Sequence, residues 1–393
     1  LNYLSEVYVR NNPEILYSRD QRIDENTRFI REKLIPQEFV TEYYALENAD
    51  DVNEMWEEFY SRPPIFESYT HFKTSPHIGK YMGVTDHGFR MVKEQGPWPV
   101  DQQYYNIFFF GGSTAYGVGP YWATIASYLQ EHMNNNGSFE KKKVRVYNFG
   151  RSGYQSSQQS ILLQRILLKN VPDMVVFFDF LNDFCWTDGN PSSWTFLERY
   201  FNDYNKKALE KAYSNNIKTE WYHIQNFIKS LTLFRLTHAL LNRLNEKPLP
   251  EYAKLTEQRK RKTKKWNKSA DEDTLKSVII RYNIIKKQVE ALGQKFNFKT
   301  FFVAQPVPLF KYDRNYHFFN PDILGCHINS EYGYPILEKF YKEGFFGNNF
   351  LWAADLQEDK KENLYVDSFH YTANFSSEIA SFISKEIINN KNY

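Results

Sequence analysis

The segment Tyr105–Tyr116, with the sequence YNIFFFGGSTAY, constrains the fold of this chain more than any other segment does. Four large apolar residues, Ile107–Phe110, are followed by two glycines and then by Ser113 and Thr114. A short apolar run that stops at glycines is typical of a buried strand in a parallel sheet. Ligands of open α/β sheets bind beyond the carboxyl ends of the strands, so Ser113 is a candidate functional residue. The alternative is that Ser113 or Thr114 only caps the helix that follows.

The same strand–turn–helix pattern recurs along the chain. Further strands are predicted at Val144–Asn148, Met174–Phe180 and Phe298–Ala304. Apolar residues at helical spacing predict helices at Tyr121–Met133, Gln155–Lys169, Asp273–Gln294 and Asn374–Ile388. Strands that alternate with helices in this way predict an α/β protein with a doubly wound parallel sheet.

Two regions depart from this alternation. Residues 1–100 predict an N-terminal extension, helical at first and irregular later. Gly83–Arg90 is interpreted as a surface loop leading to the core, and the alternative is that it places Asp86, His87 or Arg90 near the site. Residues from about 186 to 272 predict a helical insertion, and its basic run Arg259–Lys268 is interpreted as a solvated surface. We therefore predict one catalytic domain over residues 101–393, interrupted by that insertion. Helices in these two regions are predicted at Asn26–Leu34, Asp51–Tyr60, Trp194–Tyr204 and Thr219–Leu244, and residues 307–360 are interpreted as loop-rich.

Composition narrows the class of protein. The chain is 42% hydrophobic and 24% charged, as expected of a globular protein, and its net charge of +2 gives no reason to expect a nucleic-acid partner. No apolar run has the length of a membrane span. Because the chain starts at Leu1 rather than Met, we expect that a signal peptide or a membrane anchor preceded it. Aromatic residues make up 18%, which suits a large core and also a sugar-binding cleft.

Cysteine and histidine usage argues against a metalloprotein. Cys185 and Cys326 are the two cysteines, too few for a Cys-rich zinc site or a disulfide scaffold. We expect two buried free thiols, and the alternative is a disulfide in an oxidising compartment. The nine histidines form no HExxH or similar motif, so we expect neither a metal nor another cofactor.

Four polar features remain to be explained: Ser113, Gly153, Asn182, and the pair Asp367 and His370. Serine needs a base to accept its proton, and that base needs a partner that fixes its tautomer. His370 suits the role of base and Asp367 that of its partner. Backbone N–H groups of Ser113 and Gly153, with the Asn182 amide, suit an oxyanion hole. Taken singly, Gly153 is a turn glycine and Asn182 a strand-end turn residue.

In this order the four features resemble the blocks of the SGNH (GDSL-like) hydrolases, each centred on Ser, Gly, Asn or His. The matching segments are GGST at Gly111–Thr114, NFGRSGY at Asn148–Tyr154, FLND at Phe180–Asp183 and DSFH at Asp367–His370. The resemblance covers roughly residues 104–185 and 299–388. It implies a three-layer α/β/α, flavodoxin-like fold, a Ser113–His370–Asp367 triad and ester hydrolysis.

The chain departs from the family pattern at two positions. Gly112 stands where the family often has aspartate before the nucleophile, and Phe180 stands where the third block usually begins with glycine. We expect the bulky Phe180 to narrow the pocket or to shift Asn182. Ala115 in place of the last glycine of a GxSxG turn argues against an ordinary α/β-hydrolase, and a P-loop is excluded because no Gly-Lys-Ser/Thr follows.

The expected function is hydrolysis of carboxylic esters, with acetyl groups on a glycan as the suggested substrate. The alternatives are O-acyl transfer on the same fold and a catalytically weak binding or assembly protein of the cell envelope. We expect an extracytoplasmic location, periplasmic or membrane-anchored, because of the missing start Met and the suggested glycan substrate.

Overall fold

The structure is a computed structural model that describes residues 37–60, 64–135, 139–185, 270–318 and 325–390. These residues belong to one compact unit. The helices predicted before residue 37 and between residues 186 and 269, and the basic run Arg259–Lys268, lie outside the described residues. The description below therefore concerns the α/β unit alone.

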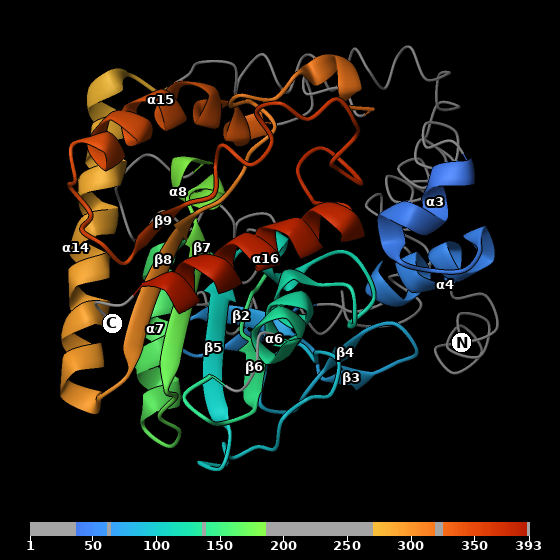
Figure 1. The fold of residues 1–393 in the computed structure, drawn as a ribbon, viewed down its shortest axis with the longest axis horizontal. Coiled ribbons are helices and arrows are strands. Elements are labelled where there is room, and N and C mark those ends of the chain that lie inside the picture. Colours follow the sequence, from blue (N-terminus) through green and yellow to red (C-terminus); the bar gives the residue numbers. More distant parts are fainter. Residues whose placement is uncertain (1–36, 61–63, 136–138, 186–269, 319–324, 391–393) are drawn as a thin grey trace, which may run out of the picture. The chain divides into compact units, whose positions relative to one another are not determined.

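A parallel sheet of five strands forms the centre of this unit (Figure 1). Its strands are β5 (Tyr105–Gly111), β6 (Val144–Asn148), β7 (Met174–Asp179), β8 (Lys299–Ala304) and β9 (Phe350–Trp352). Their order in the sheet is β6-β5-β7-β8-β9, with every neighbouring pair parallel. This is the flavodoxin-like order, and it reverses direction at β5, where such sheets bind their ligands. The predicted fold class is confirmed.

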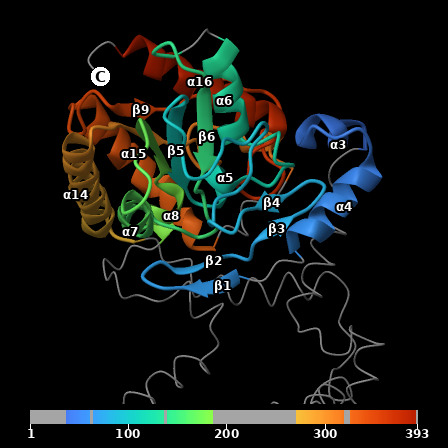
Figure 2. The same ribbon diagram turned by 90° about the horizontal axis from the view of Figure 1, so that it is seen from below.

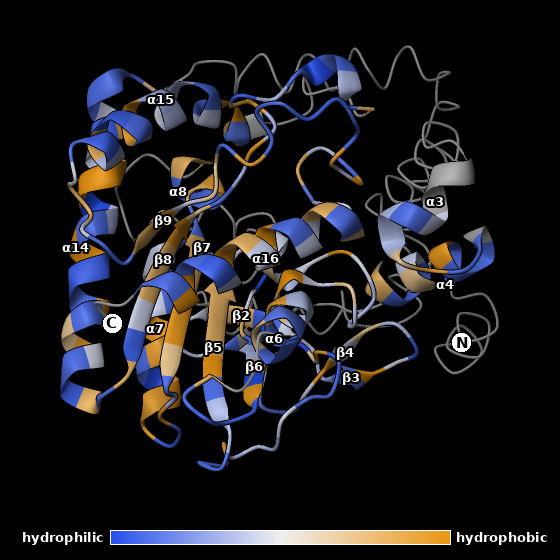
Figure 3. Ribbon diagram, viewed as in Figure 1, coloured by the Kyte–Doolittle hydropathy of each residue, from blue (hydrophilic) through white to orange (hydrophobic). Residues whose placement is uncertain are grey.

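Helices cover both faces of the sheet (Figure 2). One face carries α6 (Ile125–Asn135) and α16 (Ala373–Asn389), and the other carries α7 (Ser156–Leu167) and α14 (Glu272–Phe296). Because both faces are covered, strands such as β5 and β7 are apolar along their whole length, while the helices turn hydrophilic residues outward (Figure 3). These helices and β5 to β8 confirm the predicted elements to within a few residues.

Alternate side chains of β5 pack on opposite faces of the sheet. Ile107 and Phe109 belong to the core that includes α6 and α16. Phe110 instead stacks on Phe149 and Phe177, with ring centroids 5.4 and 5.0 Å apart, and Phe177 stacks on Phe302 at 5.5 Å. This row of rings crosses the sheet beneath α14 and explains part of the high phenylalanine content.

Before β5, the described residues from 37 onward form two helices and two hairpins. They are α3 (Gln37–Tyr44), α4 (Ala49–Tyr60), the pair β1 (Pro64–Glu67) and β2 (His71–Thr74), and the pair β3 (His77–Ile78) and β4 (Gly83–Val84). A separate core cluster joins residues of this part, such as Met55 and Tyr81, to Tyr116 and Val118, which follow Ser113. Helix α4 confirms the prediction at Asp51–Tyr60, whereas the β1–β2 hairpin was not predicted.

The region 307–360 is more ordered than predicted. It contains α15 (Asn329–Lys342) and the edge strand β9. Helix α15 includes Gly333 and Pro335, and β9 has three residues, so neither leaves a strong periodic pattern in the sequence. Among the described residues, no helix is long and apolar enough to cross a membrane.

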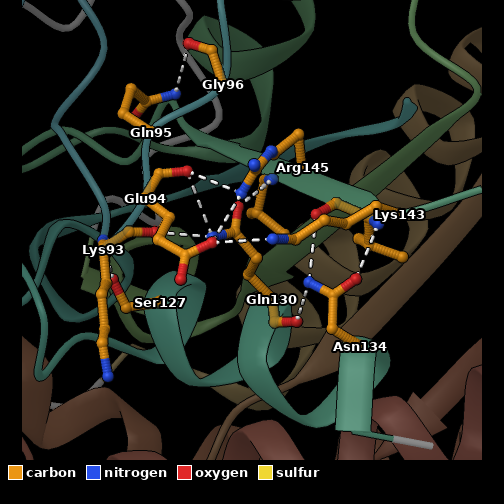
Figure 4. A network of polar contacts seen from close by, with 11 residues as sticks. Lys93, Glu94, Gln95, Gly96, Ser127, Gln130, Asn134, Lys143 and Arg145 are labelled. Carbon is orange, nitrogen blue, oxygen red and sulfur yellow. Dashed lines mark hydrogen bonds and ion pairs between the residues drawn. The ribbon is translucent and has the colours of Figure 1, made fainter. Parts of the chain in front are cut away.

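A polar network holds the amino-terminal end of β6 to α6 (Figure 4). Lys143 Nζ and Arg145 Nη1 lie 3.0 and 3.2 Å from Glu94 Oε2. Gln130 Oε1 accepts from Val146 N at 2.9 Å, while its Nε2 donates to Lys93 O at 2.6 Å. This network lies toward the amino-terminal end of the strands, whereas Ser113 follows the carboxyl end of β5.

Candidate active site

Ser113 lies at the carboxyl end of β5, at the first position of the one-turn helix α5 (Ser113–Tyr116). The first N–H groups of a helix have no acceptor within it. In the part of the chain that the structure describes, no other group accepts from the Ser113 N–H either. The side chain of Ser113 is half-buried, and Thr114 beside it is buried.

Gly112 lies against the third block. A Cβ atom at this position would lie 2.3 Å from Asn182 Nδ2 and 3.4 Å from Tyr154 O. Any larger side chain at position 112 therefore requires Asn182 to move. The departure from the usual aspartate thus has a steric reason: glycine lets the Asn182 amide approach the turn before Ser113.

Gly153 belongs to a turn that is fixed to β5. Phe149 N donates to Phe109 O at 2.8 Å and Arg151 N donates to Gly111 O at 3.0 Å. Gly153 has a φ of 74°, in the left-handed region that favours glycine. Its N–H finds no acceptor within the described residues.

Asn182 lies on the short helix α8 (Leu181–Cys185), directly after β7. Its Nδ2 donates to Tyr154 O at 2.9 Å, which leaves the second hydrogen of this amide for another acceptor. Together with the contact to Gly112, this hydrogen bond brings the Ser, Gly and Asn segments to one place at the ends of β5, β6 and β7.

Phe180 does not narrow this place, so our expectation about it was wrong. Its φ of 86° lies in the left-handed region, which explains why the family prefers glycine there. The ring is buried, with its centroid 4.1 Å from that of Tyr282 on α14, and it also contacts Phe350. Asn182 stays against Gly112 because the Phe180 ring packs under the helices instead.

Asp183 fixes α8 against the helix that follows Gly153. Its Oδ1 accepts from Ser156 Oγ at 2.6 Å and from Ser156 N at 3.2 Å. Burial raises the pKa of Asp183, and it raises the pKa of the neighbouring Asp179 well above the ordinary value, with the charge of Asp183 adding to this effect. Both carboxyl groups therefore join structural elements in the interior.

Asp367 and His370 form a close pair. His370 Nδ1 lies 2.7 Å from Asp367 Oδ2, and Asp367 Oδ1 accepts from the backbone N–H groups of Phe369 and His370 at 3.0 and 2.9 Å. His370 Nε2 is buried and has no hydrogen-bond partner among the described residues. The carboxylate thus orients the ring, and the second ring nitrogen remains available to accept a proton.

Arg90 supports the segment after Ser113, so the favoured interpretation of Gly83–Arg90 as a surface loop was wrong for this residue. It is buried, not part of a surface loop, and its guanidinium donates to the carbonyl groups of Tyr116, Gly117 and Gly119. Burial lowers its pKa to about 10. Asn148 Nδ2 donates to Ala115 O at 3.0 Å, so two side chains hold the carbonyl groups at the end of α5. The single usable signal was a charged residue among apolar neighbours, Phe89 and Met91.

Cys185 and Cys326 form a disulfide, with their Cα atoms 4.6 Å apart, so the expectation of free thiols was wrong. The bond joins the last residue of α8 to the 3-10 helix Gly325–Ile328. His327 lies beside both sulfur atoms, and among the described residues this group has ligand atoms close enough for a metal, within 4.8 Å. Disulfide sulfurs are not thiolate ligands, so the oxidised group does not suit a metal.

The site can be compared with known proteins. A family model described as GDSL-like Lipase/Acylhydrolase matches residues 107–383. An acetylxylan esterase from Geobacillus stearothermophilus has a TM-score of 0.34 and 12% identity, covering 75% of this chain and 96% of its own. A lipolytic protein of the G-D-S-L family from Veillonella parvula has a TM-score of 0.34 and 8% identity, covering 72% and 98%. A sequence comparison with curated proteins finds no significant match.

Proposed function

Because the chain belongs to the GDSL-like lipase/acylhydrolase family, we propose that it is a serine hydrolase of carboxylic esters with Ser113, His370 and Asp367 as its triad. One observation carries this proposal. His370 is held by Asp367 through Nδ1, while its buried Nε2 has no partner among the described residues. A buried polar atom without a partner is costly, and such atoms are retained where function requires them.

The proposed reaction has two steps. Ser113 Oγ attacks the carbonyl carbon of the ester while His370 Nε2 accepts the hydroxyl proton, and Asp367 stabilises the imidazolium that forms. The alcohol then leaves with the proton from His370, and the acyl group remains on Ser113. In the second step water attacks the acyl-enzyme, with His370 again as the base, and the acid is released.

The negative oxygen formed in each step requires donors that are already in place. We assign this role to the N–H groups of Ser113 and Gly153 and to the free hydrogen of the Asn182 amide. The support is that no described group accepts from either N–H, and that the amide lies against Gly112. Loss of one such donor typically raises the barrier by about 3–4 kcal/mol.

Among esters, we propose acetyl groups on a glycan as the first class to test, because of the aromatic-rich composition. Acyl transfer to a sugar hydroxyl uses the same acyl-enzyme and is distinguished by its product. The binding-protein alternative loses its main support, since the Phe180 ring packs away from Asn182. We also propose an extracytoplasmic location, because disulfides such as Cys185–Cys326 persist in oxidising compartments.

Hydrolysis of p-nitrophenyl acetate tests the reaction. We expect Ser113→Ala to lower kcat by at least about 10³-fold without loss of fold. The matched control is Ser127→Ala, since Ser127 Oγ donates to Tyr121 O at 2.6 Å and accepts from Lys93 N at 2.9 Å, within the network of Figure 4 rather than among the four site segments. Equal activity of the Ser113→Ala variant and the wild type would contradict the assignment of the nucleophile. Acetylated xylan oligosaccharides, assayed for released acetate and for transferred acetyl groups, then distinguish hydrolysis from transfer.

A further inference from the structure

Gln305 connects the residue after Ser113 with the residue after His370. It follows β8 directly and is 2% exposed. Its Oε1 accepts from Thr114 Oγ1 at 2.7 Å and from the hydroxyl of Tyr371 at 3.0 Å. Thr114 and Tyr371 are the next residues after Ser113 and His370, so one amide oxygen joins the two segments that supply the proposed nucleophile and base.

The orientation of this amide is itself fixed. Gln305 Nε2 donates to Asp179 O at 2.9 Å, and its backbone carbonyl accepts from the hydroxyl of Tyr334 at 2.8 Å. With Nε2 directed to the end of β7, Oε1 faces the two hydroxyl groups. The Tyr371 hydroxyl also lies 2.6 Å from Pro306 O, so its hydrogen is shared between two acceptors beside β8.

Such a bridge matters because neither Ser113 nor His370 lies within a long regular element. Ser113 begins a one-turn helix, and His370 ends a loop that leads to α16. A displacement of about 1 Å between reacting groups is enough to cost about 10²-fold in rate.

We infer that Gln305 is a positioning residue, which holds Ser113 and His370 at reacting distance through Thr114 and Tyr371. The inference rests on the proposed ester hydrolysis. Gln305 is buried beneath the two segments, so it acts through them and does not touch the substrate.

The test compares two buried glutamines. Gln305→Leu removes the bridge, and Gln130→Leu removes hydrogen bonds of the same kind in the network toward the amino-terminal end of the strands (Figure 4). With p-nitrophenyl acetate we expect Gln305→Leu to lower kcat by about 10- to 100-fold with KM nearly unchanged. Gln130→Leu should shift the midpoint of urea unfolding by a similar amount and leave kcat within about twofold.

A mutant cycle shows whether Gln305 acts through its two partners. The double variant Thr114→Val/Tyr371→Phe removes the same two hydroxyl groups, so adding Gln305→Leu to it should lower kcat by no more than about twofold. If Gln305→Leu does not fold, this double variant tests the bridge in its place. Its own kcat should be at least about 10-fold below that of the wild type. Equal losses of kcat in Gln305→Leu and Gln130→Leu, or wild-type kcat in the double variant, would overturn the inference about Gln305 and leave the proposed function unaffected. No ester turnover by the folded wild-type protein would overturn the proposed function, and the inference with it.

Discussion

The two ends of the parallel sheet differ in how their polar groups are used. At the amino-terminal end, Glu94 faces Lys143 and Arg145, and both ends of the Gln130 amide are bonded to backbone (Figure 4). At the carboxyl-terminal end, the described residues leave several polar groups without a partner. They are His370 Nε2, the N–H groups of Ser113 and Gly153, and one hydrogen of the Asn182 amide.

Among the described residues, buried atoms without a partner also occur at the amino-terminal end, at Arg145 Nε and the Tyr105 hydroxyl. The carboxyl-terminal end differs in that its unpaired groups are a histidine nitrogen held by a carboxylate and several N–H donors, which suit a reaction. Cavity volume does not identify which end of the sheet carries the site. A cavity of about 470 Å³ lies at the amino-terminal end, lined by residues such as Tyr105, Asp173 and Thr300, and the charged Lys299 beside it is paired with Glu140. The carboxyl-terminal end is identified by the kind of unpaired groups it holds, a histidine nitrogen and several N–H donors, and by the reversal of strand order at β5.

The comparison is tested most strongly with two asparagines, one at each end. We expect Asn182→Ala to lower kcat for p-nitrophenyl acetate by about 10²- to 10³-fold, because it removes an oxyanion donor. Asn134 binds the backbone of Val144, with Val144 N 2.8 Å from its Oδ1. Asn134→Ala should therefore cost about 1 kcal/mol of unfolding free energy and leave kcat within about twofold. A kcat for Asn182→Ala equal to that of Asn134→Ala would remove Asn182 from the proposed oxyanion hole.

Two glutamates extend the comparison to stability. Glu67 is mostly buried and its carboxylate lies 2.5 Å from Arg151, in the segment that precedes Gly153, whereas the side chain of Glu94 is 59% exposed. Burial alone raises the pKa of Glu67, but the charge and hydrogen bond of Arg151 outweigh it and lower the pKa. We expect Glu67→Gln to lower the unfolding free energy by about 3 kcal/mol, since it leaves the positive charge of Arg151 buried without its carboxylate partner. Glu94→Gln should change it by less than about 1 kcal/mol, as measured by urea denaturation at pH 7. Similar values for both variants would contradict the view that the buried Glu67–Arg151 pair stabilises the fold more than the exposed pairs of Glu94 do.

A smaller effect concerns pH and the loop that carries Asp367. His317 is buried, and burial lowers its pKa to about 4, although the backbone of Ser368 and the charge of Asp367 act in the opposite direction. Between pH 6.5 and 4 the unfolded chain binds the proton more strongly than the folded one, so the unfolding free energy falls as the pH falls through this range. From pH 7 to pH 5 this loss is about 2 kcal/mol.

His317→Gln removes this titration. Urea unfolding at pH 7 and pH 5 should therefore show a pH-dependent loss that is about 2 kcal/mol smaller in the variant than in the wild type. The same loss in both proteins would mean that His317 is protonated in the folded state at pH 5.

The fold was predictable because β5 to β8 and their helices carry strong patterns. Continuous apolar strands such as Met174–Asp179 require two covered faces, and the glycines after Phe110 mark the end of a strand. The weak elements were missed for physical reasons: β9 has three residues, and α15 contains Pro335. The pairing of Cys185 with Cys326 depends on the distance between α8 and a segment 141 residues later, which no local pattern gives.

The candidate site was predictable as a set of residues but not as an arrangement. Ser113, Gly153 and Asn182 follow strands that lie side by side, so their approach follows from the sheet order. The partners that hold them, Arg90 and Gln305, come from elsewhere and bond mainly to backbone or to neighbours of the site residues. The expectation for Phe180 failed for a different reason. The effect of this residue depends on the direction of its side chain, which its identity alone does not give.

Labelling with a serine-reactive fluorophosphonate tests the central claim most directly. Mass spectrometry of the intact protein and of its peptides should find one adduct on wild type, located on Ser113, and none on Ser113→Ala. His370→Ala should slow the labelling by at least about 10³-fold, whereas Ser127→Ala should be labelled like the wild type. Labelling that survives Ser113→Ala, or an adduct located on a different serine, would contradict the assignment of Ser113 as the nucleophile activated by His370 and Asp367.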